Sequence, residues 1–313
     1  MTTKPLLYYY DEVPTEPYFK ALRALIPNAD IRNYPDWGDR AQASYAMVWH
    51  PPHGLLKAHP NIEVIFSLGA GVDHLLSDPD LPRDVPIVRM ADTGLKEGMA
   101  EHVTMHALMH QRRMTDILKN QRTAHWDRLY PKLAGDVTIG IMGYGVLGTH
   151  VAKHLKAFGF PITTWSGSPK PEEHGVSHFH GQDQLAAFLG GADIIVLLLP
   201  ATPATHHILN AKTLAYCRHG ASIINAGRGA AVDIDALMAS IKAGHIKSAS
   251  LDVFEEEPLP ADHPAWAMEE IFVTPHVAAV TQVSPAVAYM VDMIAAYERG
   301  EALSNLVDLK KGY

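Results

Sequence analysis

Short apolar segments of strand length alternate with helical segments from residue 137 onward, and this pattern constrains the fold most. The expected strands are 137–142, 161–165, 193–199, 221–226, 248–254 and 271–274. Residues 193–199 are almost wholly apolar, which is typical of a strand covered on both faces. Between the first two strands, Leu147, Val151, Leu155 and Phe158 recur at helical spacing. Such alternation predicts an α/β fold with a doubly wound parallel sheet.

The first hundred residues show the same alternation more weakly. The expected strands there are 6–10, 45–49, 62–68 and 85–90. Helices are expected at 18–26, 55–59, 98–119 and 285–298, and residues 168–180 are expected to form a surface loop. A chain of 313 residues has room for two domains. We therefore expect two α/β domains, each large enough to bury a core.

Charge and cysteine content exclude several classes of protein. The 34 acidic residues outnumber the 26 basic ones, so nucleic-acid binding through clustered Lys and Arg is not expected. The only cysteine, Cys217, excludes an internal disulfide and fits a reducing compartment. The apolar run near the start is interrupted by Asp11 and Glu12, and no run reaches 18 apolar residues. We expect a cytoplasmic protein without a membrane partner.

A glycine motif lies between the expected strand 137–142 and the helix that follows it. Gly143, Tyr144, Gly145, Val146, Leu147 and Gly148 match the pattern G-x-G-x-x-G. In this context the glycines allow a tight turn, a close approach of a pyrophosphate and close helix packing. The free amides at the helix start then face the phosphates. The motif favours dinucleotide binding over the alternative, a plain glycine-rich turn.

The end of the next expected strand indicates which dinucleotide is bound. An Asp or Glu about 20 residues after the motif would bind the ribose hydroxyls of NAD. This chain instead has Ser166, Ser168 and Lys170, with no acid among residues 164–170. Two hydroxyls and a cation can accept a 2′-phosphate, so we expect NADPH, with NADH as a possible second cofactor. The alternative is that these are ordinary loop residues.

Four segments occur in the order seen in one enzyme family. They are residues 68–73 (LGAGVD), 225–229 (NAGRG), 251–258 (LDVFEEEP) and 274–276 (TPH). With the glycine motif, the chain resembles the D-isomer-specific 2-hydroxyacid dehydrogenases over essentially its whole length. Residues 48–52 (VWHPP), together with 307–308 and 311–313, resemble the glyoxylate/hydroxypyruvate reductase A group of that family.

This resemblance implies a Rossmann cofactor domain at 101–274. It also implies a flavodoxin-like substrate domain made of 1–100 and 275–313, and a homodimer. Arg228 would hold the substrate carboxylate and carbonyl, His276 would exchange the proton, and Glu257 would orient His276. The further residues implied are Ala70, Gly71 and Trp49 for the substrate, and Pro200, Ala226 and Asp252 for the cofactor. One departure is Gly167, where relatives that prefer NADP often carry Arg.

The chemistry of three of these residues also supports the implied reaction. Reduction of a 2-oxo acid needs a carboxylate anchor, a proton donor and charge stabilisation at the carbonyl oxygen. The planar guanidinium of Arg228 can contact carboxylate and carbonyl together. His276 can supply a proton near neutral pH, and Glu257 can fix its tautomer. Each residue alone also fits a structural role, as a cap, a solvated acid or a strand-end histidine.

We therefore expect an oxidoreductase that uses NADPH to reduce small 2-oxo acids, glyoxylate and hydroxypyruvate. The alternatives are a reductase of a bulkier 2-oxo acid and a nucleotide-sensing, corepressor-like binding protein. His102, His106 and His110 share one helical face, but Val103 stands where the metalloprotease motif has Glu. His174, His178 and His180 cluster in the expected loop. We expect no metal site, at these groups or elsewhere in the chain.

Overall fold

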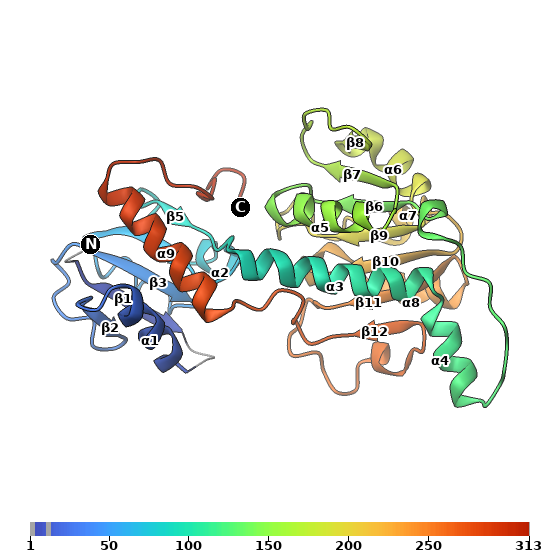
Figure 1. Ribbon diagram of the computed structural model, residues 1–313, viewed down its shortest axis with the longest axis horizontal. Helices are drawn as coiled ribbons and strands as arrows, with labels where there is room; N and C mark the ends of the chain where they lie inside the picture. Colours follow the sequence, from blue (N-terminus) through green and yellow to red (C-terminus); the bar gives the residue numbers. More distant parts are fainter. Residues whose placement is uncertain (1–3, 11–13, 313) are drawn as a thin grey trace. The chain divides into compact units, whose positions relative to one another are not determined.

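The computed structural model describes residues 4–10 and 14–312, which divide into two compact units (Figure 1). One unit, the N/C unit, contains residues up to Leu95 and from Val280 onward; the other, the central unit, is Lys96–Ala279. The first boundary lies within helix α3 (Thr93–Gln111). Asp11 and Glu12, which interrupt the N-terminal apolar run, lie outside the described residues.

The central unit is built on a parallel sheet. Its described strands are β6 (Ile139–Met142), β7 (Ile162–Ser166), β8 (Val176–His180), β9 (Ile194–Leu197), β10 (Ala221–Asn225), β11 (Ile246–Leu251) and β12 (Ile271–Val273). They pair in the order β12-β11-β10-β9-β6-β7-β8. This is the doubly wound Rossmann order with one further strand. The strand order reverses direction between β6 and β9, and ligands bind at such a point beyond the carboxyl ends of the strands.

Helices cover both faces of this sheet. The bounds of the helices are α5 (Val146–Ala157), α6 (Leu185–Gly191), α7 (Ala211–Leu214) and α8 (Ile234–Lys242), with short 3₁₀ turns at Ala134–Asp136, Gln182–Gln184, Gly229–Ala231 and Pro264–Ala267. Ile139 and Ile141 of β6 share a core with α3 and α5, whereas Met142 packs in a core with α6, α7 and α8. Alternate β6 side chains thus enter opposite cores, as a strand buried on both faces requires.

The N/C unit contains a second parallel sheet. Its described strands are β1 (Leu6–Tyr10), β2 (Ile31–Asn33), β3 (Ser44–Trp49), β4 (Ile62–Ser67) and β5 (Ile87–Val88). They pair in the flavodoxin-like order β2-β1-β3-β4-β5. Its helices are α1 (Glu16–Leu25), α2 (Asp73–Leu76) and α9 (Val283–Glu298), and α1 packs against α9. The predicted α/β class with two doubly wound sheets is confirmed.

Four local expectations were wrong. The helix expected at 98–119 is two helices, α3 and α4 (Met114–Arg122), because Arg113 has a left-handed backbone with φ of 62°. Residues 55–59 form turns rather than a helix, and 168–180 contains the edge strand β8. Strand β2 was not expected. Both β2 and β8 are only partly buried, so they lack the apolar pattern that identifies a strand.

Candidate active site

The three motif glycines have different structural reasons to be glycine. Gly143 has φ of 99°, and a Cβ there would lie 2.5 Å from the Leu198 carbonyl oxygen. A Cβ on Gly148 would lie 2.0 Å from the Gly143 carbonyl oxygen. Around Gly145, the residue before α5, a Cβ would meet nothing within 4 Å. The turn is therefore close-packed on the protein side and open at Gly145, which fits the approach of a pyrophosphate to the amides of α5.

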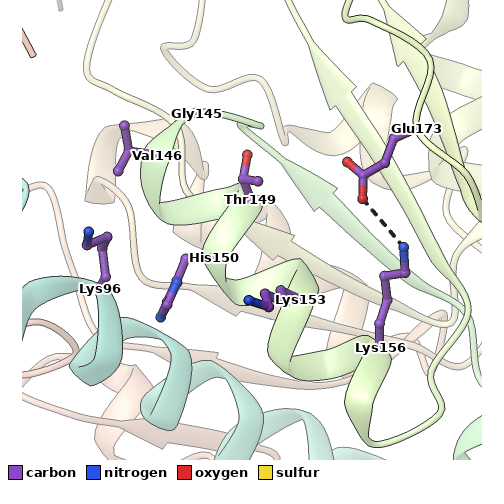
Figure 2. Close-up of a pocket in the computed structure, with 8 residues that line it drawn as sticks. All are labelled: Lys96, Gly145, Val146, Thr149, His150, Lys153, Lys156 and Glu173. Carbon is purple, nitrogen blue, oxygen red and sulfur yellow. Dashed lines mark hydrogen bonds and ion pairs between the residues drawn. The ribbon is translucent and has the colours of Figure 1, made fainter. Parts of the chain in front are cut away.

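A cavity of about 670 Å³ lies beside this turn (Figure 2). Gly145, Val146 and Thr149 line it from the start of α5, and Lys96 and Lys153 add positive charge. Lys156 is paired with Glu173 at 3.4 Å across the same cavity. Positive charge beside open helix amides suits an anionic ligand. Sequence reasoning missed the two lysines because only the fold brings Lys96 of α3 near α5.

The residues expected to select the dinucleotide lie at the end of β7. Ser166 is buried, and its hydroxyl donates to the carbonyl oxygen of Ser168 at 2.8 Å. The Ser166 oxygen can accept a further hydrogen bond, but the Ser166 hydroxyl proton is already donated to the Ser168 carbonyl oxygen. Gly167 has open space around it, and Lys170 is half-buried. The absence of an acid from residues 164–170 is the feature that favours a 2′-phosphate here.

His276 and Glu257 form a close polar contact at the carboxyl ends of β11 and β12. His276 Nδ1 lies 2.6 Å from Glu257 Oε2, and the Phe254 amide donates to Glu257 Oε1 at 2.8 Å. The His276 amide donates to the Asp252 carbonyl oxygen at 2.8 Å. Both carboxylate oxygens and the histidine backbone are thereby fixed. The carboxylate orients the ring through Nδ1, and Nε2 remains able to hold or release a proton.

The two groups shift each other's protonation in opposite directions. The hydrogen bond to Glu257 raises the pKa of His276, outweighing the desolvation and the Arg228 charge that lower it. Burial raises the pKa of Glu257, but the hydrogen bonds from His276 and the Phe254 amide and the charges of His276 and Arg228 outweigh it, so that pKa is lowered. The charged pair is therefore favoured near neutral pH.

Arg228 lies in the loop after β10, next to the loop that carries Glu257. Asn225 holds this loop by donating to the Arg228 carbonyl oxygen at 3.0 Å, and Arg228 Nη1 donates to the Gly227 carbonyl oxygen at 2.8 Å. A Cβ on Gly229 would lie 1.9 Å from the Phe254 carbonyl carbon, so only glycine lets the two loops pack so closely. The central unit therefore brings Arg228 together with Glu257 and His276.

Asp252 supports the segment that follows β12. Its Oδ1 accepts from the Thr274 hydroxyl at 2.6 Å and the Val277 amide at 2.9 Å, and its Oδ2 accepts from the Ala278 amide at 2.9 Å. The carboxylate is buried, so these bonds fix the path of the chain through His276. Sequence reasoning missed Thr274 and the Phe254 amide as supports, because neither has a distinctive spacing.

The remaining expected residues lie in two places. Ala226 is buried after β10, and the Pro200 carbonyl oxygen accepts from Thr205 after β9, both at the end of the central sheet where ligands bind. In the N/C unit, Trp49 stacks on His50 with ring centroids 5.0 Å apart. A Cβ on Gly69 would lie 2.3 Å from the Trp49 ring, so Trp49 packs on the loop that contains Ala70 and Gly71.

The histidine groups considered in the sequence have mainly internal contacts. His110 is buried and bridges the Ser248 and Ser250 hydroxyls, at 2.9 Å from each ring nitrogen. Burial lowers the pKa of His110 to about 3 and that of His106 to about 4. His178 contacts the Thr164 hydroxyl at 2.6 Å.

The family model for the NAD-binding domain of D-isomer specific 2-hydroxyacid dehydrogenases matches residues 104–278. The chain belongs to the D-isomer specific 2-hydroxyacid dehydrogenase family. The predicted family is confirmed, and so is the predicted enzyme class, an NAD(P)-dependent 2-hydroxyacid dehydrogenase. Among the described residues, no helix is long and apolar enough to span a membrane.

Solved structures of this family resemble the whole chain. A D-isomer specific 2-hydroxyacid dehydrogenase from Xanthobacter autotrophicus Py2, in complex with NADPH and MES, is 39% identical, with 100% of both chains covered and a TM-score of 0.95. An NADPH-dependent glyoxylate/hydroxypyruvate reductase from Sinorhizobium meliloti, in complex with NADP and sulfate, is 36% identical (99% and 100% covered, TM-score 0.92). A probable 2-hydroxyacid dehydrogenase from Rhizobium etli CFN 42, in complex with NADP, HEPES and L(+)-tartaric acid, gives the same values.

Proposed function

We propose that this protein reduces small 2-oxo acids, with glyoxylate and hydroxypyruvate as substrates, to 2-hydroxy acids with NADPH. The observation that carries the proposal is the 2.6 Å contact between His276 and Glu257, on a loop packed against the loop of Arg228. A charged imidazole beside a guanidinium offers a proton donor and a carboxylate anchor together. Those are the two groups that reduction of a 2-oxo acid needs from the protein.

His276 acts as the acid in reduction. Negative charge develops on the carbonyl oxygen of the substrate as the carbonyl carbon is reduced, and a proton from the imidazolium neutralises it. Glu257 keeps the ring charged and oriented before transfer, because the contact raises the pKa of His276. In the reverse direction, the neutral ring accepts the proton of the hydroxyl group.

Arg228 binds the substrate carboxylate and stabilises the charge on the carbonyl oxygen. A guanidinium presents a planar fork of donors that matches two oxygens, which a lysine ammonium does not. Its charge also acts on both Glu257 and His276. The amides of Ala70 and Gly71 provide the second anchor for the carboxylate, by the family resemblance.

The proposed cofactor is NADPH, which supplies the hydride when bound. The open space at Gly145 and the positive charge of Lys96 and Lys153 fit its pyrophosphate. The absence of an acid at the end of β7 fits its 2′-phosphate, with Ser168 and Lys170 as its partners. Ser166 becomes a third partner when its hydroxyl turns from the Ser168 carbonyl oxygen to the phosphate. The relatives from X. autotrophicus and S. meliloti, in complex with NADPH and NADP, support this choice.

The proposed substrates are small because Trp49 packs against the loop of Ala70 and Gly71. A bulky ring beside the carboxylate anchor leaves little room for a large substituent. The S. meliloti relative, named as a glyoxylate/hydroxypyruvate reductase, supports the same substrate class. One methylene in a pocket changes selectivity by about 1–3 kcal/mol, so a graded preference is expected.

A panel of 2-oxo acids with both reduced cofactors tests this function. We expect the highest kcat/KM with glyoxylate or hydroxypyruvate and NADPH, and lower values with branched and aromatic 2-oxo acids. A highest value with phenylpyruvate would contradict the substrate proposal. Equal use of NADH and NADPH would contradict the cofactor proposal and leave the substrate result standing.

We further propose that residues 101–274 form the cofactor domain, and that 1–100 with 275–313 form the substrate domain. Hydrogen exchange tests these roles directly. NADPH should protect amides near Gly145, and a non-reacting 2-oxo acid analogue should protect those at Ala70 and Gly71. Protection by the analogue confined to residues 101–274 would contradict the assignment.

We also propose that the protein is a cytoplasmic homodimer. In the segment after α4, Trp126, Tyr130 and Leu133 are 97%, 80% and 73% exposed, an apolar surface suited to a second copy of the chain. Sedimentation should give a dimer mass for the parent and a monomer mass for the triple variant Trp126→Ser, Tyr130→Ser, Leu133→Ser. The buried free thiol of Cys217 fits a reducing compartment, which cell fractionation tests.

A further inference from the structure

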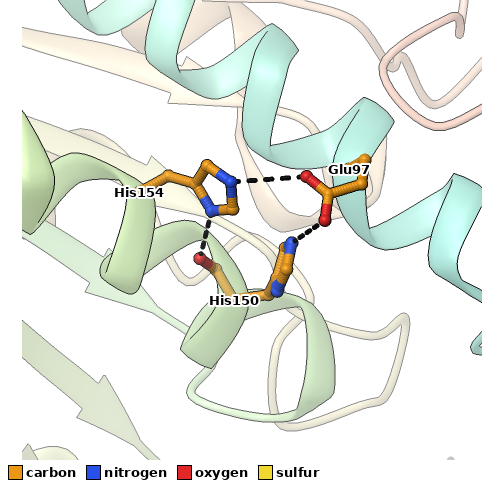
Figure 3. Close-up of side chains that lie close together, drawn as sticks. All are labelled: Glu97, His150 and His154. Atoms are coloured by element: carbon orange, nitrogen blue, oxygen red, sulfur yellow. Dashed lines mark hydrogen bonds and ion pairs between the residues drawn. The ribbon is translucent and has the colours of Figure 1, made fainter.

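Three side chains converge between two helices of the central unit, and one of them, His150, also lines the cavity beside the glycine turn. Glu97 comes from α3, and His150 and His154 come from α5 (Figure 3). His150 Nε2 lies 3.1 Å from Glu97 Oε1, and His154 Nε2 lies 3.3 Å from Glu97 Oε2. Histidines four residues apart share one face of a helix, so both rings can reach the same carboxylate.

The second nitrogen of His154 fixes how the ring meets the carboxylate. His154 Nδ1 lies 3.0 Å from the carbonyl oxygen of His150, which can only accept a hydrogen bond. The Nδ1 nitrogen is therefore the donor, and in the neutral ring Nε2 carries a lone pair that faces Glu97. Two acceptors at this distance require a proton or a metal ion between them. Metal-binding histidines commonly donate their other nitrogen to a backbone carbonyl in this way.

The donor atoms have the spacing of a metal site. With bonds of about 2.0–2.1 Å, the edge between two ligand atoms of a tetrahedral zinc site is about 3.3–3.4 Å. The distances of 3.1 and 3.3 Å from Glu97 to the two histidines are close to this edge. The nitrogen and oxygen donors all lie within 4.8 Å of one another. The two histidines contact different oxygens of Glu97, so one ion between them is held by both oxygens, or by one oxygen after the carboxylate turns.

The surroundings determine which ion fits. The side chain of Glu97 is 45% exposed and that of His154 is 37% exposed, so water can complete the coordination. Lys96 and Lys153 line the same cavity as His150, and their charge weakens the binding of any cation. Imidazole ligands favour zinc and other late first-row metals, whereas magnesium and calcium favour sites made of oxygen ligands.

We propose that Glu97, His150 and His154 bind one divalent transition-metal ion of the zinc type. The ion ties α3 to α5, the helix that begins at the glycine turn. This site differs from the histidine groups weighed in the sequence. The sequence shows that His150 and His154 are four residues apart. Glu97 lies 53 residues before His150, so only the fold brings it close to them.

Zinc titration of a tag-free protein tests the proposal. The experiment uses a His206→Ala, His207→Ala background, because these residues and Glu255 form another group of three residues that could bind a metal ion. We expect this background to bind one zinc ion per chain and to gain thermal stability from it. Adding His154→Ala or Glu97→Gln should weaken zinc binding at least about tenfold. The matched control is His174→Ala, an exposed histidine outside the group.

Cobalt and magnesium provide the second readout. Co²⁺ bound at this site should give the visible absorption of a low-coordinate cobalt centre, and zinc should remove it while magnesium does not. Circular dichroism and NADPH binding establish that each variant is folded. The proposal is overturned if the background binds no zinc, because a proton alone then joins His154 to Glu97. It is also overturned if zinc binding persists unchanged in both His154→Ala and Glu97→Gln.

Discussion

Replacing His276 by asparagine removes the proposed proton donor while preserving its backbone. His276 has φ of 52°, a left-handed conformation that asparagine adopts more readily than most residues. Its amide can still donate to the Asp252 carbonyl oxygen, and the residues of the glycine turn at 143–148 are unchanged. The substitution therefore separates proton transfer from cofactor binding.

The expected loss of turnover in His276→Asn follows from the proposed role of His276 as the general acid. Loss of a general acid lowers turnover by about 10²–10⁴-fold, or about 2.7–5.4 kcal/mol in the activation barrier. The effect on stability is small, because the side chains of His276 and Glu257 are 51% and 34% exposed. A solvated ion pair contributes about 1 kcal/mol or less to the free energy of unfolding. The variant should be folded and nearly inactive.

Two measurements test this expectation. The kcat is measured with glyoxylate from the absorbance of the reduced nicotinamide, and the Kd for NADPH is measured by fluorescence titration. The matched control is His206→Asn, a histidine that is also near a carboxylate, 3.6 Å from Glu255. A kcat within tenfold of the parent would show that His276 is not the proton donor. A loss of NADPH affinity as large as the loss of kcat would show that the substitution acts through the cofactor site.

Three other substitutions have definite expected outcomes. Ser166→Asp should erase or reverse the preference for NADPH over NADH, measured as the ratio of kcat/KM values, because a carboxylate repels the 2′-phosphate; an unchanged ratio would contradict the role of this loop. Arg228→Lys should raise KM for glyoxylate more than it lowers kcat, since an ammonium cannot make the two-pronged contact; an unchanged KM counts against it. His106→Leu should stabilise the protein in acid. Both ring nitrogens of buried His106 lack a partner among the described residues, and its pKa is lowered to about 4. The contribution of neutral His106 to the free energy of unfolding is therefore fully present above about pH 6.5 and is lost as pH falls toward 4. At pH 5 the loss is about 2 kcal/mol. Urea unfolding at pH 5 and pH 8 measures the free energy of unfolding of the variant relative to the parent, and the increase should be larger at pH 5.

The buried parts of the fold were predictable from the sequence. Strands β6, β9 and β10 are fully buried, and their apolar runs identified them. Asp233 caps α8, since its side chain accepts from the Ala236 amide, and its place just before apolar residues at helical spacing indicates this role from the sequence alone. The half-exposed edge strands β2 and β8 and the break at Arg113 depend on tertiary packing, which no local pattern records.

The candidate site was predictable only in part. Residues with distinctive chemistry, such as His276 and the glycines of the turn, are visible in the sequence. The support of Glu257 by a backbone amide, and of the 274–278 segment by Asp252, requires chain segments to meet in space. The use of the Ser166 proton within its own loop was likewise visible only in the structure.

The pairing of Glu257 with His276 as the acid is tested by the pH profile of kcat/KM for glyoxylate reduction by the parent and by Glu257→Gln. Glu257 raises the pKa of His276, so the acid form is present below that raised pKa and is lost as pH rises through it. Reduction by the parent should therefore fall with rising pH. The variant lacks the negative charge, and its falling limb should lie at lower pH. Superimposable profiles would show that Glu257 does not set the pKa of the acid, and Glu255 or Glu256 would be the next carboxylates to test.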